Sequence, residues 1–176
     1  MDRQHLVTER LDLRPISAAD ADRLAVLHAD ARVMNLLQHG VLTRAQSDAL
    51  VANYEAEWPA LGFGSWTARE RASGRLVGLG GLRVHSGDYG VAIRLAFTPE
   101  AQGKGYGTEL ARAALHFAFE VAKLDRVVAL TRSDNGPSQR SLETAGMARE
   151  SEIRMESGRT ILVYALHNPK SAKHHI

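Results

Sequence analysis

The chain has 176 residues, of which 44% are hydrophobic and 24% are charged, a balance typical of a soluble globular protein with a core of its own. It has no cysteine, which excludes disulfides, thiolate metal sites and a cysteine nucleophile. The formal net charge of +2 is mild and gives no case for direct nucleic-acid binding.

The beginning of the chain carries charged residues, among them Asp2, Arg3 and Glu9, and lacks the apolar run of a signal peptide. No stretch approaches the ~20 apolar residues that a membrane span requires. We therefore expect a cytoplasmic protein with no membrane contact. Residues 1–176 are expected to form a single domain, with an ordered core over about 8–166 and a polar tail over 168–176.

The first third of the chain predicts one strand and two helices. Apolar and polar residues alternate over 11–14, as in a half-buried strand. A cap at Ser17 or Asp20 opens a first helix. Residues 43–46 form a capping-box pattern that opens a second helix, and Pro59 is expected to follow its end.

The middle of the chain predicts three strands, over 63–69, 75–84 and 91–97. Ser73-Gly74 marks a hairpin between the first two, and the turn at 86–88 leads into the third. The sequence therefore predicts consecutive antiparallel strands here.

A long amphipathic helix is predicted from Tyr106, followed by a central strand over 127–131 and two final strands near 147–156 and 159–166. One face of the helix carries apolar residues at spacings of four, three and four, namely Leu110, Ala114, Phe117 and Val121. This face is expected to pack in the core. The order of elements predicts an α+β fold with a mixed, mostly antiparallel sheet covered by helices.

Three glycines lie in the stretch Gln102-Gly103-Lys104-Gly105-Tyr106-Gly107, between a strand and the start of a helix. Glycines let the backbone turn tightly, and a helix N-terminus presents unpaired N–H groups and partial positive charge. Together these features predict a cradle for a pyrophosphate. The spacing fits neither the dinucleotide fingerprint G-x-G-x-x-G nor a Walker A loop.

The same loop matches Q-x-x-G-x-G/A and resembles the acyl-CoA loop of the GNAT acetyltransferases. Residues 134–147 resemble the family's D-N-x-x-S-x-x-x-L-E-x-x-G-F segment. Residues 8–16 are similar to the T-E-R-L-x-L-R-P opening of the branch that includes ribosomal-protein N-terminal acetyltransferases, and residues 61–67 resemble its G-F-G-x-W strand start. The resemblance runs from about Thr8 to Leu166. It implies a GNAT-like sheet in which the strands 91–97 and 127–131 splay apart.

The resemblance also implies acetyl-CoA as the acyl donor, bound by backbone groups of the splayed strand and by the loop. The implied cofactor-binding residues are Leu95, Ala96, Phe97, Thr98, Gln102, Gly103, Lys104, Gly105, Tyr106, Gly107, Thr108, Asn135 and Ser138. Asn135 has a competing interpretation as the cap of the helix that follows it. No metal site is expected, because His116 and the pair His174-His175 lack ligand partners at a suitable spacing.

The sequence identifies the catalytic groups less clearly than the cofactor-binding residues. In many family members a tyrosine protonates the departing thiolate, but Leu142 stands at that place, and Ser138 is the candidate that remains. Ser138 could equally be a first-turn serine that satisfies the helix. A glutamate base is common on the strand before the loop, where this chain has Ala92. Glu100, His85 or a water chain to backbone carbonyls are the remaining base candidates.

The acceptor side is expected over about 29–63. Its candidate lining residues are Asn35, His39, Tyr54, Trp58 and Trp66. No acidic cluster marks a polyamine or aminoglycoside pocket. The resemblance implies direct transfer of acetyl to a primary amine in a ternary complex, with a homodimer possible. Two alternatives stay open: a transferase for a longer acyl-CoA such as succinyl-CoA, and a CoA-binding sensor module without turnover.

Overall fold

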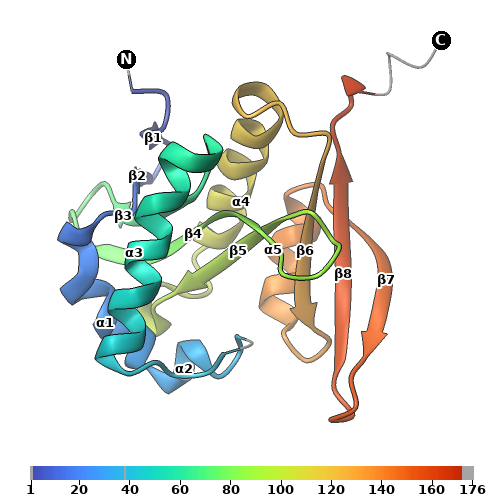
Figure 1. The fold of residues 1–176 in the computed structure, drawn as a ribbon, viewed down its shortest axis with the longest axis horizontal. Coiled ribbons are helices and arrows are strands. Elements are labelled where there is room, and N and C mark those ends of the chain that lie inside the picture. The colour runs from blue at the N-terminus through green and yellow to red at the C-terminus, as the bar shows by residue number, and fades with distance from the viewer. Residues whose placement is uncertain (1, 38, 172–176) are drawn as a thin grey trace.

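The computed structural model describes residues 2–37 and 39–171, so the expected tail beyond 171, with His174-His175, lies outside the described residues. Eight strands form one sheet in the order β1-β2-β3-β4-β5-β6-β8-β7 (Figure 1). The strands are β1 Leu6–Val7, β2 Leu11–Pro15, β3 Ser65–Glu70, β4 Leu76–Val84, β5 Val91–Phe97, β6 Arg126–Arg132, β7 Ala148–Arg154 and β8 Thr160–His167. All neighbours are antiparallel except β5 and β6. The prediction of a mixed, mostly antiparallel sheet is confirmed.

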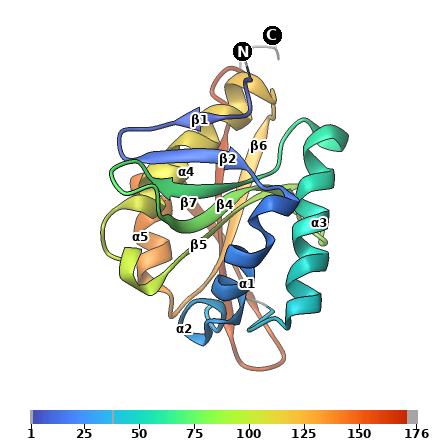
Figure 2. The same ribbon diagram turned by 90° about the vertical axis from the view of Figure 1, so that its left-hand side faces the viewer.

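Helices cover both faces of the sheet, with α1 and α3 on one side and α4 and α5 on the other (Figure 2). The α-helices are α1 Ala21–Ala29, α2 Ala31–Met34, α3 Arg44–Leu61, α4 Tyr106–His116 and α5 Gly136–Thr144. Short 3₁₀ turns, η1 Ala18–Asp20 and η2 Pro99–Ala101, precede α1 and the glycine-rich loop, and a π-helical turn, η3 Phe117–Val121, extends α4. Among the described residues, no helix combines the length and the apolar character needed to cross a bilayer.

Two details of the predicted helices are wrong. The helix α3 runs through Pro59 and ends at Leu61, because Gly62 adopts the left-handed conformation (φ 76°) that closes the last turn. Val121 is 39% exposed rather than packed with Leu110 and Ala114. The reason is the π turn, in which the Ala122 N–H donates to Phe117 O and the wider turn rotates Val121 out of the apolar stripe.

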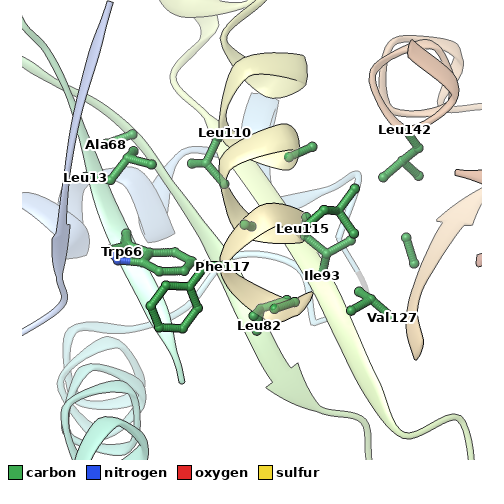
Figure 3. Close-up of a cluster of buried hydrophobic side chains, with 14 of the residues drawn as sticks. Leu13, Trp66, Ala68, Leu82, Ile93, Leu110, Leu115, Phe117, Val127 and Leu142 are labelled. Atoms are coloured by element: carbon green, nitrogen blue, oxygen red, sulfur yellow. The ribbon is translucent and has the colours of Figure 1, made fainter. Parts of the chain in front are cut away.

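The main core lies between the sheet and α4. Figure 3 shows Leu110 and Leu115 of α4 among side chains from the strands, with Leu142 of α5 closing one side. Trp66 and Phe117 lie edge to face, with ring centroids 5.3 Å apart. A second core lies under α1 and α3 on the other face. The two cores fix the sheet between two helical layers.

Candidate active site

The neighbouring parallel strands β5 and β6 separate soon after they begin. Their register contains one pair, Ala92 with Val128, whereas β4 pairs with β5 along its whole length. The carboxyl end of β5 therefore has a partner on one edge only. An open edge leaves backbone donors and acceptors for an added partner. The splayed strand pair expected from the resemblance is present.

Alternation along β5 decides which backbone groups face this opening. The Thr98 N–H donates to Val77 O at 2.9 Å, so Thr98 and, two residues earlier, Ala96 turn their backbone groups toward β4. Leu95 and Phe97 turn theirs toward the opening. The carbonyl of Phe97 already accepts a hydrogen bond from Gln102 Nε2 at 3.1 Å. Within the stretch 95–98 that was expected to bind the cofactor, the backbone groups that face the opening without a partner among the described residues are therefore those of Leu95 and the N–H of Phe97.

The glycine-rich loop joins the end of β5 to the start of α4. Gly103 and Gly105 have φ angles of 76° and 82°, a region that favours glycine, and Gly105 is the N-cap of α4. Lys104 is exposed between them, and Thr108 is half-buried in the first turn. The loop therefore leaves the N-terminal N–H groups of α4 accessible, as an anion site requires.

Tyr106 and Gly107 serve packing in this structure. The Tyr106 hydroxyl donates to Glu70 Oε2 at 2.5 Å, and its ring is buried. A Cβ added at Gly107 would lie 3.0 Å from Ser141 Oγ, so this glycine lets α4 and α5 approach closely. Tyr106 thus ties the end of the loop to β3, and Gly107 lets α4 lie close to α5.

A carboxylate in the first turn of α4 ties the loop to the start of the chain. Glu109 Oε1 accepts from Thr8 Oγ1 at 2.6 Å and from the Arg10 N–H at 2.7 Å, and Oε2 accepts from Arg10 Nε at 2.8 Å. Arg10 Nη1 also donates to the carbonyl of Lys104 at 2.7 Å, and the guanidinium lies 4.6 Å from the centre of the Tyr106 ring. We call Thr8, Arg10 and Glu109 the clamp.

The clamp shifts the ionisation of its carboxylate. Burial by itself raises the pKa of Glu109, but the hydrogen bonds from Thr8 and Arg10 outweigh burial and hold the pKa below its ordinary value. Sequence reasoning missed this role. The N-terminal motif around Thr8 and Arg10 resembles the family, but nothing in that motif indicates a contact with Glu109, about a hundred positions away.

The N-terminus of α5 lies at the carboxyl end of β6, as the N-terminus of α4 lies at the carboxyl end of β5. Both helix starts therefore flank the opening of the splayed pair. Asn135 caps α5, since its Oδ1 accepts from the Ser138 N–H at 3.3 Å. This cap uses only the oxygen of the amide and leaves its NH₂ group as a donor. Ser138 is partly exposed in the first turn of α5.

The two positions where the resemblance implies an acid and a base in many family members lie in apolar surroundings. Ala92 packs with Val128 and Ala165, and Leu142 is 2% exposed in the main core. His85 Nδ1 accepts from the Gly87 N–H at 2.9 Å, so the lone pair of the neutral ring is engaged and Nε2 carries the proton. This geometry favours a structural role for His85.

The expected acceptor residues divide into three buried aromatic residues and two polar residues after α2. Tyr54 is 6% exposed and packs in the second core. Trp58 and Trp66 belong to the main core, at 4% and 0% exposure, so their assignment to a pocket is wrong. The Trp58 indole N–H donates to Ser65 O and fixes α3 on the sheet. The Asn35 carbonyl accepts from Arg132 Nη1 at 2.9 Å, which ties the segment after α2 to the end of β6. His39 is exposed.

No three histidine, aspartate or glutamate side chains within residues 2–37 and 39–171 gather in a way that could hold a metal ion. The site thus offers backbone amides, one loop lysine and the hydroxyl of Ser138. Such a set suits an extended ligand that carries amides and a pyrophosphate.

Comparisons with a family model, with curated sequences and with solved structures all indicate the same family. A model of the Acetyltransferase (GNAT) domain matches residues 10–148. The uncharacterized N-acetyltransferase YnaD of Bacillus subtilis (strain 168) is 28% identical over 146 residues, which cover 83% of this chain and 84% of that protein. The crystal structure of a GNAT-family acetyltransferase from Bacillus anthracis superposes with a TM-score of 0.81 at 25% identity, covering 93% of this chain and 98% of that one.

A more distant structure shares the fold. Spermidine N-acetyltransferase from Vibrio cholerae, solved in complex with CoA and spermine, superposes with a TM-score of 0.78 at 18% identity. The match covers 94% of this chain and 99% of that one. At this identity the likeness concerns the arrangement of the sheet and helices alone.

Proposed function

This chain belongs to the GNAT acetyltransferase family, and we propose that it transfers acetyl directly from acetyl-CoA to a primary amine, on a protein N-terminus or on a small molecule. Members of this family use acetyl-CoA. The observation that carries the proposal is the open edge of β5 beside two helix N-termini, one of them preceded by the glycine-rich loop. The absence of cysteine supports direct transfer, because no acetyl-cysteine intermediate can form.

The residues at the opening would hold the donor along its length. Backbone groups of Leu95 and Phe97 would pair with the amides of pantetheine as an added strand does. The N–H groups from Gly103 to Gly107 would receive the pyrophosphate, with the charge of Lys104 beside them. The NH₂ group of Asn135 would donate to a pantetheine carbonyl. Ala96, Gln102, Tyr106 and Thr108 would shape this channel through packing and hydrogen bonds within the protein.

Acetyl-CoA supplies an acetyl thioester, so a C–N bond forms, a C–S bond breaks and the amine loses a proton. Ser138 would give a proton to the sulfur, and its position in the first turn of α5, beside the opening, supports this role. We assign the role of base to a water in contact with backbone carbonyls, because Ala92 offers no carboxylate, the lone pair of His85 is engaged and Glu100 is a 68% exposed loop charge. Holding both substrates side by side at the opening would supply much of the rate.

The test of the donor site is calorimetric titration of the full chain with acetyl-CoA, CoA and NADPH. We expect micromolar binding of the first two and no response to NADPH. Gln102→Ala should weaken acetyl-CoA binding, because it frees the Phe97 carbonyl and loosens the end of β5. Release of CoA thiol is then followed over a panel of amines. Absence of acetyl-CoA binding would contradict the proposal.

The apolar residues Ala92 and Leu142 favour a second candidate, a CoA-binding sensor without turnover. Binding of acetyl-CoA without thiol release over the whole amine panel would support it. A transferase for a longer acyl-CoA would instead release thiol faster from succinyl-CoA than from acetyl-CoA. The N-terminal motif over residues 8–16 further supports placing the chain in the branch of ribosomal-protein N-terminal acetyltransferases.

A further inference from the structure

Arg94 lies on β5 at the point where the strand leaves β6, two residues beyond the Ala92–Val128 pair. Side chains alternate along a strand. Ile93 and Phe97 pack under α4, whereas Ala96 packs with the core beneath α1 and α3. Arg94 therefore points toward α3, away from α4 and its loop. It stands at the opening of the splayed pair, on the face opposite the proposed pyrophosphate cradle.

The neighbours of Arg94 form a charged cluster with an excess of positive charge. Arg83 of β4 holds the Glu57 carboxylate of α3 with a fork of hydrogen bonds, from Nη2 to Oε1 at 2.6 Å and from Nε to Oε1 at 3.0 Å. The Arg83 guanidinium lies 4.6 Å from the centre of the buried Tyr54 ring. Arg83 and Glu57 neutralise each other. Arg94 makes no ion pair and no side-chain hydrogen bond with the described part of the chain.

Burial makes the charged form of the Arg94 guanidinium energetically unfavourable. Burial, followed by the positive charge of Arg83, lowers the pKa of Arg94, and Tyr54 and Glu57 oppose that shift only in part. His85 faces the same cluster, where burial and the charge of Arg94 lower the pKa of the imidazole. A half-buried guanidinium without a counterion is costly, and a bound anion would remove that cost. The cluster lacks one negative charge.

We propose that Arg94 binds a carboxylate of the acceptor, so that the acceptor is a primary amine with a carboxylate a few bonds from the reacting nitrogen. The planar guanidinium fork matches a carboxylate in two parallel hydrogen bonds, and a single negative charge balances the cluster. The inference rests on the proposed acetyl transfer and adds the acceptor class. It disfavours polyamines, whose positive charges would meet the unpaired guanidinium.

The test compares matched acceptors on the full-length enzyme with saturating acetyl-CoA. Each α-amino acid is paired with its amide, and each peptide with an N-terminal aspartate or glutamate is paired with its asparagine or glutamine counterpart. Spermidine serves as a cationic amine. We expect kcat/KM to be about 10- to 100-fold higher for the carboxylate member of one of these pairs. Preference in the first pair identifies free amino acids as acceptors, and preference in the second identifies acidic peptide N-termini.

Arg94→Gln should abolish the preference by raising KM for the carboxylate acceptor about 10- to 100-fold, with the rate on the matched amide changed less than about threefold. Arg94→Lys should restore part of it, since it keeps the charge and loses the fork. Arg154→Gln is the matched control, because its side chain is 85% exposed on the edge strand β7. Binding of acetyl-CoA should be unchanged in all three variants.

Three results separate this inference from the proposed function. If the unaltered enzyme acetylates amides and spermidine with the same kcat/KM as carboxylate acceptors, the assignment of Arg94 is wrong, but the proposed acetyl transfer stands. The same holds if Arg94→Gln lowers the rate on both members of a pair equally. If no amine in the panel releases thiol although acetyl-CoA binds, the proposed transfer itself fails.

Discussion

The two sides of the splayed strand pair are built in different ways. On the proposed donor side, the end of β5, the glycine-rich loop and the start of α4 follow one another in the chain. On the proposed acceptor side, Tyr54 and Glu57 of α3, Arg83 of β4 and Arg94 of β5 come together from separate elements. The proposed pyrophosphate cradle is thus a property of a contiguous segment, whereas the acceptor side, like the approach of Asn135 and Ser138 to the cradle, is a property of packing. Changes on one side should therefore leave binding on the other side intact.

The largest effect is expected at the start of α5. Ser138→Ala should lower kcat about 100-fold if the hydroxyl gives a proton to the departing sulfur. The affinity for acetyl-CoA should stay the same, since the Asn135 cap binds the backbone N–H at this position. Steady-state rates with calorimetry on the same samples check this. A loss of melting temperature with kcat unchanged would assign Ser138 a structural role. Ser141→Ala, on the same helix, is the control.

The clamp should matter next, because it joins the donor loop to the start of the chain. Glu109→Gln removes the charge from a carboxylate that accepts three hydrogen bonds and is 14% exposed. We expect the free energy of unfolding to fall by about 2 kcal/mol and acetyl-CoA to bind several-fold more weakly. Denaturant unfolding and calorimetry measure both. Glu100→Gln, with a side chain that is 68% exposed, should change neither.

A change on the proposed acceptor side should lower the stability of the protein without weakening the binding of acetyl-CoA. Glu57→Gln takes the counterion from Arg83, where both side chains are less than one-fifth exposed. We expect the free energy of unfolding to fall by about 1 to 2 kcal/mol, with the affinity for acetyl-CoA unchanged. Asp48→Asn, in an exposed ion pair of the same helix, should change stability by less than about 0.5 kcal/mol. Weaker acetyl-CoA binding by Glu57→Gln would show that the two sides are coupled.

The effect that is smallest at neutral pH is a pH dependence of stability that comes from one histidine in the core under α1 and α3. His28 is 2% exposed, its Nδ1 lies 2.8 Å from Ser47 Oγ, and burial lowers its pKa. The unfolded chain therefore binds the proton more readily. Stability is kept above the unfolded pKa of about 6.5 and falls below it, by about 1.4 kcal/mol per pH unit until the lowered pKa is reached. Unfolding curves between pH 7.5 and 5, recorded with His28→Asn, test this, since the variant should lose that slope.

Most strands and helix starts could be predicted from the sequence, because they depend on local patterns. The capping box at Thr43 and the alternation in β2 are examples. The misses occurred where packing outweighs the local signal. Trp66 is entirely buried although its position suggested a pocket, and the two-residue strand β1 exists because it pairs with β2.

The sequence by itself determined the donor loop, since left-handed glycines at 103 and 105 and a helix start are features of consecutive residues. Compared with the family motifs, it also has apolar residues, Ala92 and Leu142, where the resemblance implies a glutamate and a tyrosine in many members. Only the tertiary structure decided how β5 separates from β6, because strand divergence depends on what packs on either side. The same holds for the pairing of Glu109 with Arg10 and for the unpaired charge of Arg94. These arise from contacts between distant segments, which no local pattern encodes.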